Sequence, residues 1–333
     1  MKRWMQLLLS LVLTTSVLAG CTGAPANNTQ SPAPESSPSA AAPGEPTPTP
    51  VATPEVAWPR TIVDATGAEI VLEKQPERVT LLHVVYLEHL LALGTPPTAA
   101  ALGNAQGAME SLEVSELYAP YLAGTDITML GNSKDLSVEA VLAAEPDVII
   151  TFYNPASAEL VEQLAEIAPV VQISYADTWQ NQLMLCAQVL GKETEAETVT
   201  EEVEQIIADT KEVLAPYADR TFGLFRTDGK SFIAQGTAQF YKEFGLTKPS
   251  GFTDKADTLS LEAVAEMNPY YIVFQHNVEV TEAFIKSMED NTVWQSLDAV
   301  KNGRVYIYDE NMNSFGPLSF KLGAEKITAL YTE

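Results

Sequence analysis

The feature that most limits the possible folds of this chain is an internal repeat, in which a helix signal leads into a strand signal. Residues 136–151 (LSVEAVLAAEPDVIIT) align without gaps to residues 259–274 (LSLEAVAEMNPYYIVF). Each copy starts with a serine that can cap a helix, passes a proline typical of a turn and ends in an apolar run typical of a buried strand. The repeat predicts one equivalent unit in each half of the chain. The alternative is a generic helix–turn–strand unit, which any α/β protein contains.

Short apolar segments alternate with helical patterns on both sides of this repeat. The expected strands are residues 78–82, 148–150, 170–173, 222–225, 271–274 and 305–308, and the expected helices between the earlier strands are 86–93, 138–144 and 158–167. A hairpin around Thr66-Gly67 opens the series, within residues 61–72. This alternation predicts an α/β fold with parallel sheets covered by helices on both faces.

One charged segment between the two halves has the pattern of a long helix. In residues 193–214 the apolar positions Val199, Val203, Ile206, Ile207 and Val213 fall near helical spacing. We therefore expect an N-terminal lobe over residues 58–190, a connecting helix over 191–216 and a C-terminal lobe over 217–333.

The first residues have the pattern of an export signal. Lys2 and Arg3 precede an apolar run, residues 7–13, that is too short to span a bilayer. The run leads to Leu18-Ala19-Gly20-Cys21, which resembles the lipobox of bacterial lipoproteins. That resemblance implies a signal peptide over residues 1–20 and a lipid on Cys21, which would hold the protein at the outer face of the cell membrane. The alternative is an ordinary signal peptide with a chance cysteine.

Residues 21–57 are rich in Pro, Ala, Ser and Thr and contain no aromatic residue, so they cannot bury enough apolar surface to fold. We expect a disordered tether. The second cysteine, Cys186, has no disulfide partner in a lipidated chain and is expected to be a buried core residue.

Composition and missing motifs exclude several classes of protein. The formal net charge of −25 argues against nucleic acid as a partner, and it requires any anionic ligand to meet a local basic cluster. The sequence has no glycine-rich phosphate loop, no GxSxG or HExxH motif and no carboxylate metal cluster. We therefore expect no enzyme activity, no cofactor and no metal bound directly by side chains. An anchored metallocluster enzyme or hydrolase is the alternative from another class.

A series of motifs resembles the binding proteins of ABC importers for iron–siderophore, haem and vitamin B12. Besides the two LSxEAV copies, these motifs are VDATG at 63–67, QPERV at 75–79, IAPVV at 167–171, WQSLDAVKNGRVY at 294–306 and FGPLS at 315–319. The resemblance implies two Rossmann-like lobes on one backbone helix, with a ligand cleft between the lobes. It also implies a monomer that captures a ferric siderophore and delivers it to a permease dimer with its ATPase. Haem or a corrinoid is the alternative ligand.

The repeat places Glu139 and Glu262 at the same position of its two copies. In the family this glutamate forms salt bridges with permease arginines, so the resemblance implies a docking role for both. The alternative is that each is a first-turn acid that stabilises the start of its helix.

Side chains just after strand ends are the expected ligand contacts. These are His83, Tyr86, Tyr153, Arg226 and His276. If the ligand were haem, the family's use of His as an axial ligand would point to His83 and His276; otherwise both are wall residues.

Lys134 matches a position where hydroxamate-siderophore binders of the family carry an arginine that contacts the ligand. Lysine weakens bidentate recognition there. For Lys134 and Arg226 the alternative is an ordinary solvated charge.

Overall fold

The computed structural model describes residues 57–102 and 108–333, all within one compact unit that runs from Pro54 to Glu333. The predicted signal peptide, Cys21 and all of the tether except Ala57 lie outside the described residues. Among the residues described, no helix combines the length and the apolar character needed to cross a membrane.

The N-terminal lobe is built on a parallel sheet with the strand order β5-β4-β3-β6-β7. Its strands are β3 (Val79–Leu81), β4 (Ala99–Ala100), β5 (Thr128–Met129), β6 (Val148–Phe152) and β7 (Val170–Ile173). The predicted hairpin precedes this sheet as β1 (Arg60–Val63) and β2 (Glu69–Leu72), and Gly67 turns between them with a φ of 81°.

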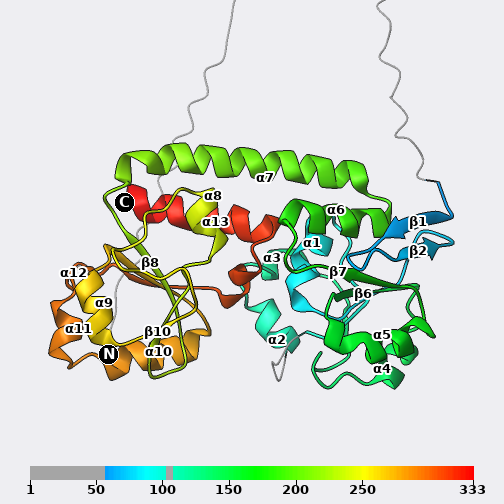
Figure 1. The fold of residues 1–333 in the computed structure, drawn as a ribbon, viewed down its shortest axis with the longest axis horizontal. Coiled ribbons are helices and arrows are strands. Elements are labelled where there is room, and N and C mark those ends of the chain that lie inside the picture. Colours follow the sequence, from blue (N-terminus) through cyan, green and yellow to red (C-terminus); the bar gives the residue numbers. More distant parts are fainter. Residues whose placement is uncertain (1–56, 103–107) are drawn as a thin grey trace, which may run out of the picture. The chain divides into compact units, whose positions relative to one another are not determined.

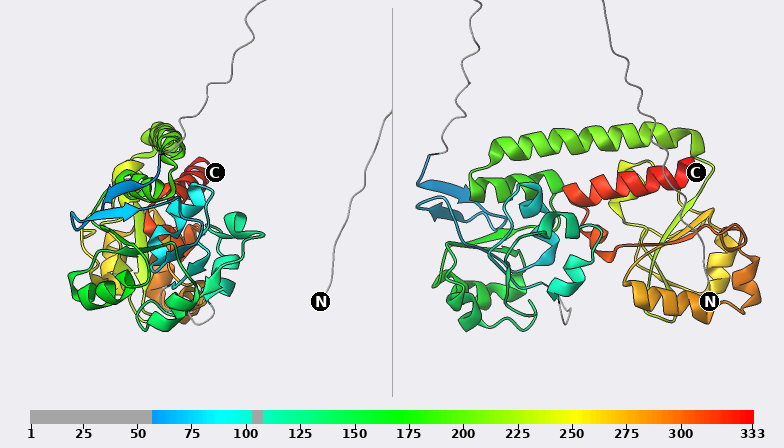
Figure 2. Two further views of the ribbon diagram at one scale, coloured as in Figure 1. Left: turned by 90° about the vertical axis from the view of Figure 1, so that its right-hand side faces the viewer. Right: turned by 180° about the vertical axis from the view of Figure 1, so that it is seen from behind.

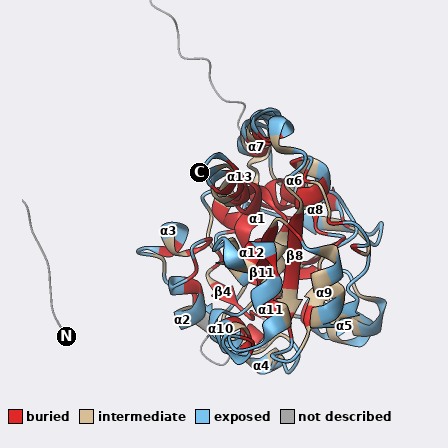
Figure 3. Ribbon diagram, turned by 90° about the vertical axis from the view of Figure 1, so that its left-hand side faces the viewer, coloured by how far each residue is buried: buried red, intermediate tan, exposed pale blue. Residues whose placement is uncertain are grey.

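The C-terminal lobe repeats the same strand order, β10-β9-β8-β11-β12. Its strands are β8 (Phe222–Thr227), β9 (Phe232–Ala234), β10 (Thr258–Leu259), β11 (Tyr271–Gln275) and β12 (Val305–Tyr308). Here β9 runs antiparallel to both of its neighbours. The central strand β8 is almost entirely buried, whereas the outer faces of α9 and α11 are exposed (Figure 3).

Helices cover both sheets (Figure 1). Those before the connecting helix are η1 (Val84–Tyr86), α1 (Leu87–Ala92), α2 (Ala108–Glu113), α3 (Ala119–Leu122), α4 (Val138–Ala143), η2 (Pro155–Ser157), α5 (Ala158–Ala165) and α6 (Trp179–Leu190). Those from it onward are α7 (Glu193–Leu214), η3 (Ala215–Tyr217), α8 (Gln239–Glu243), α9 (Leu261–Met267), α10 (Val278–Ser287), α11 (Thr292–Ser296), α12 (Asp298–Lys301), η4 (Glu310–Ser314) and α13 (Pro317–Thr332). The predicted α/β class with two lobes is confirmed.

The repeat occupies the same place in each lobe. Its helices are α4 and α9, and its strands are β6 and β11, which lie fourth in chain order in their sheets and directly beside the first. The predicted serine caps are present: the hydroxyl of Ser137 accepts the amide hydrogen of Ala140, and that of Ser260 accepts the amide hydrogen of Ala263, both at 3.2 Å.

The connecting segment is a single helix of 22 residues, α7. Its inner face buries Ala196, Val203, Ile207 and Leu214. Val213, which the spacing assigned to this face, is instead 41% exposed, because the face follows 3.6 residues per turn and passes through Leu214.

The last helix, α13, also reaches both lobes, as it lies along α7 and against α1 (Figure 2). Near its start, Phe320 packs against Trp179 with ring centroids 5.9 Å apart. Near its end, Tyr331 packs 4.8 Å from Tyr271 in the C-terminal sheet. The lobes are therefore joined by two packed helices. Cys186 is fully buried, as predicted.

Candidate ligand-binding site

The strand order of each sheet defines where a ligand can bind. In both lobes the chain moves to one side of the first strand and later returns to pair a fourth strand on its other side. Open α/β sheets bind ligands at this switch point, outside the carboxyl ends of the two strands. The switch points lie between β3 and β6 and between β8 and β11. The segment η1 that follows β3 lies against η4, which follows β12, so the carboxyl ends of the two sheets meet.

The N-terminal half of this site is formed by His83 and Phe152, whose ring centroids are 4.8 Å apart. His83 caps η1, because its Nδ1 accepts the amide hydrogen of Val85 at 3.4 Å. Burial lowers the pKa of His83, so the ring is neutral near pH 7. Tyr153 follows Phe152 and is 41% exposed, which leaves its ring free to contact a ligand.

The structure overturns the prediction for Tyr86. This side chain is fully buried, and its hydroxyl donates a hydrogen bond of 2.9 Å to the carbonyl of Ile173. The short helix η1 turns it into the core, away from the carboxyl ends. A second exposed tyrosine, Tyr175, was missed: it follows β7 and is 58% exposed. Its position just past a predicted strand was the signal that could have identified it.

The C-terminal half contains a small charged cluster. Arg226 is the half-buried, second-to-last residue of the otherwise buried strand β8. His276 follows β11, and Glu310 opens η4, with its Oε2 4.0 Å from Nδ1 of His276. Burial, with the positive charge of Arg226 adding to it, lowers the pKa of His276. Burial and the neighbouring charge of Asp309 raise the pKa of Glu310, while Arg226 opposes that rise. Sequence reasoning did not find Glu310, because an acid in a polar loop carries no distinctive signal.

An unpaired amide lies at the same switch point. Gln275 is the last residue of β11 and is 1% exposed, yet neither its Nε2 nor its Oε1 has a hydrogen-bond partner among the described residues. An unsatisfied buried polar group costs about 1–3 kcal/mol. A ligand or water molecule that reached this amide would recover part of that free energy.

Lys134 lies away from the switch point. It is exposed in the loop after β5, the edge strand, and β4 separates β5 from β3. Its amide donates to Oδ1 of Asn132 at 2.9 Å. The structure therefore does not bring Lys134 next to His83.

Glu139 and Glu262 are both exposed in the first turns of α4 and α9. Each helix begins after an edge strand, so both acids lie at the rim on the carboxyl-end side. The pKa of the Glu139 carboxyl is lowered by a hydrogen bond from its own backbone amide and, next, by the bond of 2.9 Å that the Ser137 hydroxyl donates to it. Glu139 thus also takes part in the start of its helix, as the capping alternative proposed.

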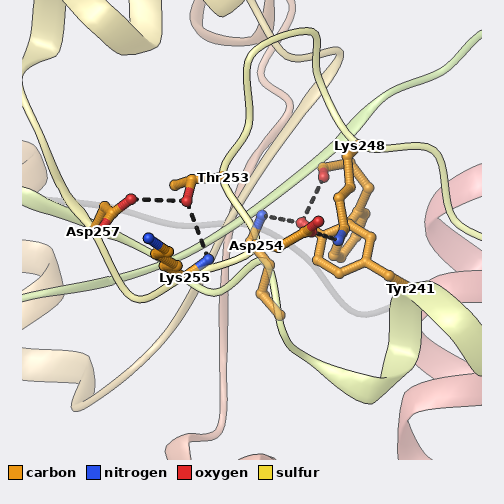
Figure 4. A network of polar contacts seen from close by, with 8 residues as sticks. Tyr241, Lys248, Thr253, Asp254, Lys255 and Asp257 are labelled. Atoms are coloured by element: carbon orange, nitrogen blue, oxygen red, sulfur yellow. Dashed lines mark hydrogen bonds and ion pairs between the residues drawn. The ribbon is translucent and has the colours of Figure 1, made fainter.

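Two cavities open on the C-terminal lobe away from the switch points. One, of about 470 Å³, lies between the β9–β10 edge and α10, and Lys230 and Ser260 line it. The other, of about 500 Å³, lies beside α8, and its Lys248 is held by Asp254 and over the ring of Tyr241 (Figure 4). In the part of the chain that the structure describes, no group of three or more His, Cys, Asp or Glu side chains is arranged to hold a metal ion.

Comparison with known families decides the class of protein. The family model described as periplasmic binding protein matches residues 79–312, which contain both switch points. The chain belongs to the periplasmic binding protein family. The protein is therefore a solute-binding protein of a transport system and not an enzyme, and the metallocluster enzyme and hydrolase alternatives are set aside.

Relatives of this binding protein in Bacillus subtilis agree with that family. The iron-uptake system-binding protein is 29% identical over 294 residues, which cover 74% of this chain and 87% of the relative. The iron(3+)-hydroxamate-binding protein FhuD is 26% identical, with 81% of this chain and 85% of the relative covered. Among solved structures, the triscatecholate siderophore binding protein FeuA of Bacillus subtilis superposes with a TM-score of 0.66 at 20% identity, covering 82% of this chain and 98% of that one. This last similarity establishes the fold of the binding protein.

Proposed function

We propose that this protein is the extracytoplasmic solute-binding component of an ABC importer, and that it captures a ferric siderophore and hands it to a membrane permease. The observation that carries the proposal is the pair of switch points. Two sheets of the same strand order meet at their carboxyl ends, where the aromatic pair His83–Phe152 belongs to one lobe and the Arg226–His276–Glu310 cluster to the other. Such a site, between two lobes, is where proteins commonly bind small molecules.

The relatives support iron as the cargo. They include binding proteins for Fe(3+)-citrate and iron(3+)-hydroxamate as well as the iron-uptake system-binding protein. The family model alone does not name a ligand, so the identity of the cargo rests on these names and on the site.

The test is a titration of the mature chain, in mild detergent, with ferric siderophores, sugars and amino acids. Binding is measured as quenching of the intrinsic tyrosine and tryptophan fluorescence of the protein. At least one ferric siderophore should bind with submicromolar affinity, whereas sugars and amino acids should not bind. Arg226→Ala should weaken that binding by about tenfold or more, since a charge-assisted contact is worth about 1.5–3 kcal/mol. Arg78→Ala is the matched control, because Arg78 pairs on the surface with Glu145 at the opposite ends of the strands. Tight binding of an amino acid with no response to any ferric siderophore contradicts the proposal.

Haem is the second candidate, and the observation that favours it is one histidine after the first strand of the N-terminal sheet, His83, and one after the fourth strand of the C-terminal sheet, His276. Haemin added to the purified chain would then give a shifted Soret band, and His83→Ala would abolish it. A corrinoid would be distinguished by its own absorbance after gel filtration.

We further propose that Cys21 carries a lipid that anchors the protein to the outer face of the membrane. Three Bacillus subtilis relatives are named as lipoproteins: a putative ABC transporter substrate-binding lipoprotein, 24% identical, a probable siderophore-binding lipoprotein, 26% identical, and an uncharacterised ABC transporter substrate-binding lipoprotein, 22% identical. Glu139 and Glu262, one on the rim of each lobe, are the proposed contacts to the two halves of a permease dimer.

A further inference from the structure

Basic side chains are scarce where the ligand would bind. We define the strand-end segments as the described residues at or just after the carboxyl ends of β3, β5, β6, β7, β8, β11 and β12: residues 82–86, 130–137, 153–157, 174–178, 226–231, 276–277 and 309–316. Apart from two histidines, their basic side chains are Lys134, Arg226 and Lys230. Lys134 is at the edge of its sheet and Lys230 is at the tip of the β8–β9 turn, so Arg226 is the basic residue nearest a switch point.

Acidic side chains outnumber them. The same segments carry Asp135, Asp177, Asp228, Asp309 and Glu310. The described stretch after β4, residues 108–117, adds three glutamates and no basic residue. One of these, Glu116, is paired with Lys326 at 2.5 Å. The field at the carboxyl ends is therefore negative, and Arg226 is already countered by the nearby charge of Glu310.

The remaining basic candidates do not change this balance. His83 and His276 both have pKa values lowered chiefly by burial, so neither adds a positive charge near pH 7. Lys248, beside α8, forms an ion pair with Asp254, and its Nζ lies 4.9 Å from the centroid of the Tyr241 ring (Figure 4). It therefore offers no free charge to a ligand.

The exposed surface at the carboxyl ends is aromatic and aliphatic instead. Tyr153 and Tyr175 extend from the ends of β6 and β7, and Val278, just after His276, is 50% exposed. Such side chains favour an apolar or uncharged ligand, and the aromatic faces also favour a cation.

Ferric chelates differ in charge according to the donor groups around the metal. Three hydroxamates, each with one negative charge, neutralise Fe³⁺ and leave a neutral core. Three catecholates, each having lost two protons, leave three negative charges, and citrate complexes are also anionic. The strand-end segments hold five acids against three bases, and Glu310 already counters Arg226. Bringing such an anion into this excess of negative charge is electrostatically unfavourable.

We propose, on the basis of the proposed function, that the ligand is a ferric tris-hydroxamate whose net charge is zero or positive, and that anionic tricatecholate and citrate chelates are excluded by the acidic strand-end segments. This narrows the proposed cargo to one class of siderophore. The aromatic side chains contact the organic periphery of the chelate, and Arg226 donates to a hydroxamate oxygen.

The experiment compares four probes with the mature chain in mild detergent: ferrioxamine B, which carries one positive charge, neutral ferrichrome, a ferric tricatecholate and ferric citrate. Dissociation constants are measured by fluorescence quenching at low and at physiological salt. At least one of the two hydroxamates should bind about tenfold or more tightly than either anionic chelate, and the gap should shrink as salt screens the acids.

A charge variant tests the cause. Glu310→Gln should improve the affinity for the tricatecholate severalfold and should not improve that for ferrioxamine B. Glu201→Gln, on the exposed side of α7, is the matched control and should change neither.

Each outcome decides between the two proposals. If the tricatecholate or ferric citrate binds as tightly as the hydroxamates, this inference is wrong while the proposed function stands. If no ferric chelate binds, the proposed function fails and the inference fails with it. If Glu310→Gln leaves the ratio of the two affinities unchanged, the acidic segments do not set the preference and the inference is overturned.

Discussion

The carboxylate of Glu88 accepts the amide hydrogen of Ser319 at 2.8 Å, although 231 residues separate them in the chain. The other carboxylate oxygen accepts the amide hydrogen of Gly316 at 2.8 Å and the hydroxyl of Ser319 at 3.2 Å. Glu88 lies on α1 in the N-terminal lobe and is fully buried, so it caps the first turn of α13 from another lobe. A helix start favours a negative charge. This contact ties α13 to the N-terminal lobe.

Glu88→Ala should lower the free energy of unfolding by about 2–5 kcal/mol, because two buried amide groups at the start of α13 lose their acceptor. Urea unfolding followed by circular dichroism measures the change. Glu325→Ala, on the exposed side of the same helix, is the matched control and should stay within about 0.5 kcal/mol of wild type. Equal effects of the two changes would show that the buried contact contributes nothing specific.

Gly316→Ala should also destabilise the protein, by about 1–3 kcal/mol, since overpacking forces neighbours to move. A methyl group at this position would lie 2.4 Å from Cδ of Glu88. The clash is with Glu88 itself, so in the Glu88→Ala background the same change should cost much less. A double-mutant cycle measures this coupling. Strict additivity would contradict the contact as described.

Acid should destabilise the protein partly through His89, which is fully buried on α1. Burial lowers its pKa from 6.5 to about 3, against the opposing effect of the nearby backbone carbonyls of Trp179 and Val85. Between these values the unfolded chain binds a proton that the folded chain does not. The contribution of His89 to the free energy of unfolding is therefore fully present above pH 6.5 and is lost as the pH drops toward 3. The slope from this group is up to about 1.4 kcal/mol per pH unit. The slope should be smaller by that amount in His89→Gln; identical slopes would refute the assignment.

The double change Glu139→Ala with Glu262→Ala should abolish uptake while ligand affinity stays within severalfold of wild type. Charges that become partly desolvated at an interface each cost about 2–5 kcal/mol when truncated, whereas exposed pairs contribute about 0–1 kcal/mol. Uptake of labelled chelate by cells and binding by the purified protein give the two readouts. Glu201→Ala with Glu212→Ala, two exposed acids of α7, is the control pair. Normal transport by the double mutant, or loss of ligand binding, would contradict the docking role. Glu139 and Glu262 would then serve only to stabilise the first turns of their helices.

Cys21→Ser should move the protein from the membrane fraction to the soluble fraction without changing its unfolding curve. Cys21 belongs to the segment that the sequence predicts to be a disordered tether, so we expect the folded part to keep its stability. Cell fractionation with a salt wash measures the distribution. A mutant that stays with the membrane after the wash would rule out the lipid.

Both lobes and their order along the chain can be predicted from the amino-acid sequence. Local patterns carry this information: the capping serines 137 and 260, the apolar runs of β6 and β11 and the helical spacing of α7 each depend on residues close together in the chain. The repeat also predicted correctly that the two strands occupy equivalent places. The predicted strand ends also indicated which side chains lie next to the ends of β3, β8 and β11, namely His83, Arg226 and His276.

Which of these side chains are exposed, and what they contact, depends on the packing of segments that are distant in the chain. Tyr86 is the last residue of η1 and is buried, and its hydroxyl bonds the carbonyl of Ile173, which is 87 residues away in the chain. In the sequence, Glu88 has the pattern of an ordinary helix-face acid and Glu310 that of an ordinary loop acid. Their partners, Ser319 on α13 and His276 after β11, are identified only in the folded chain. Burial, charge pairing and pKa depend on groups that are distant in sequence and close in space, and these are set by the packing of the two lobes rather than by any local pattern.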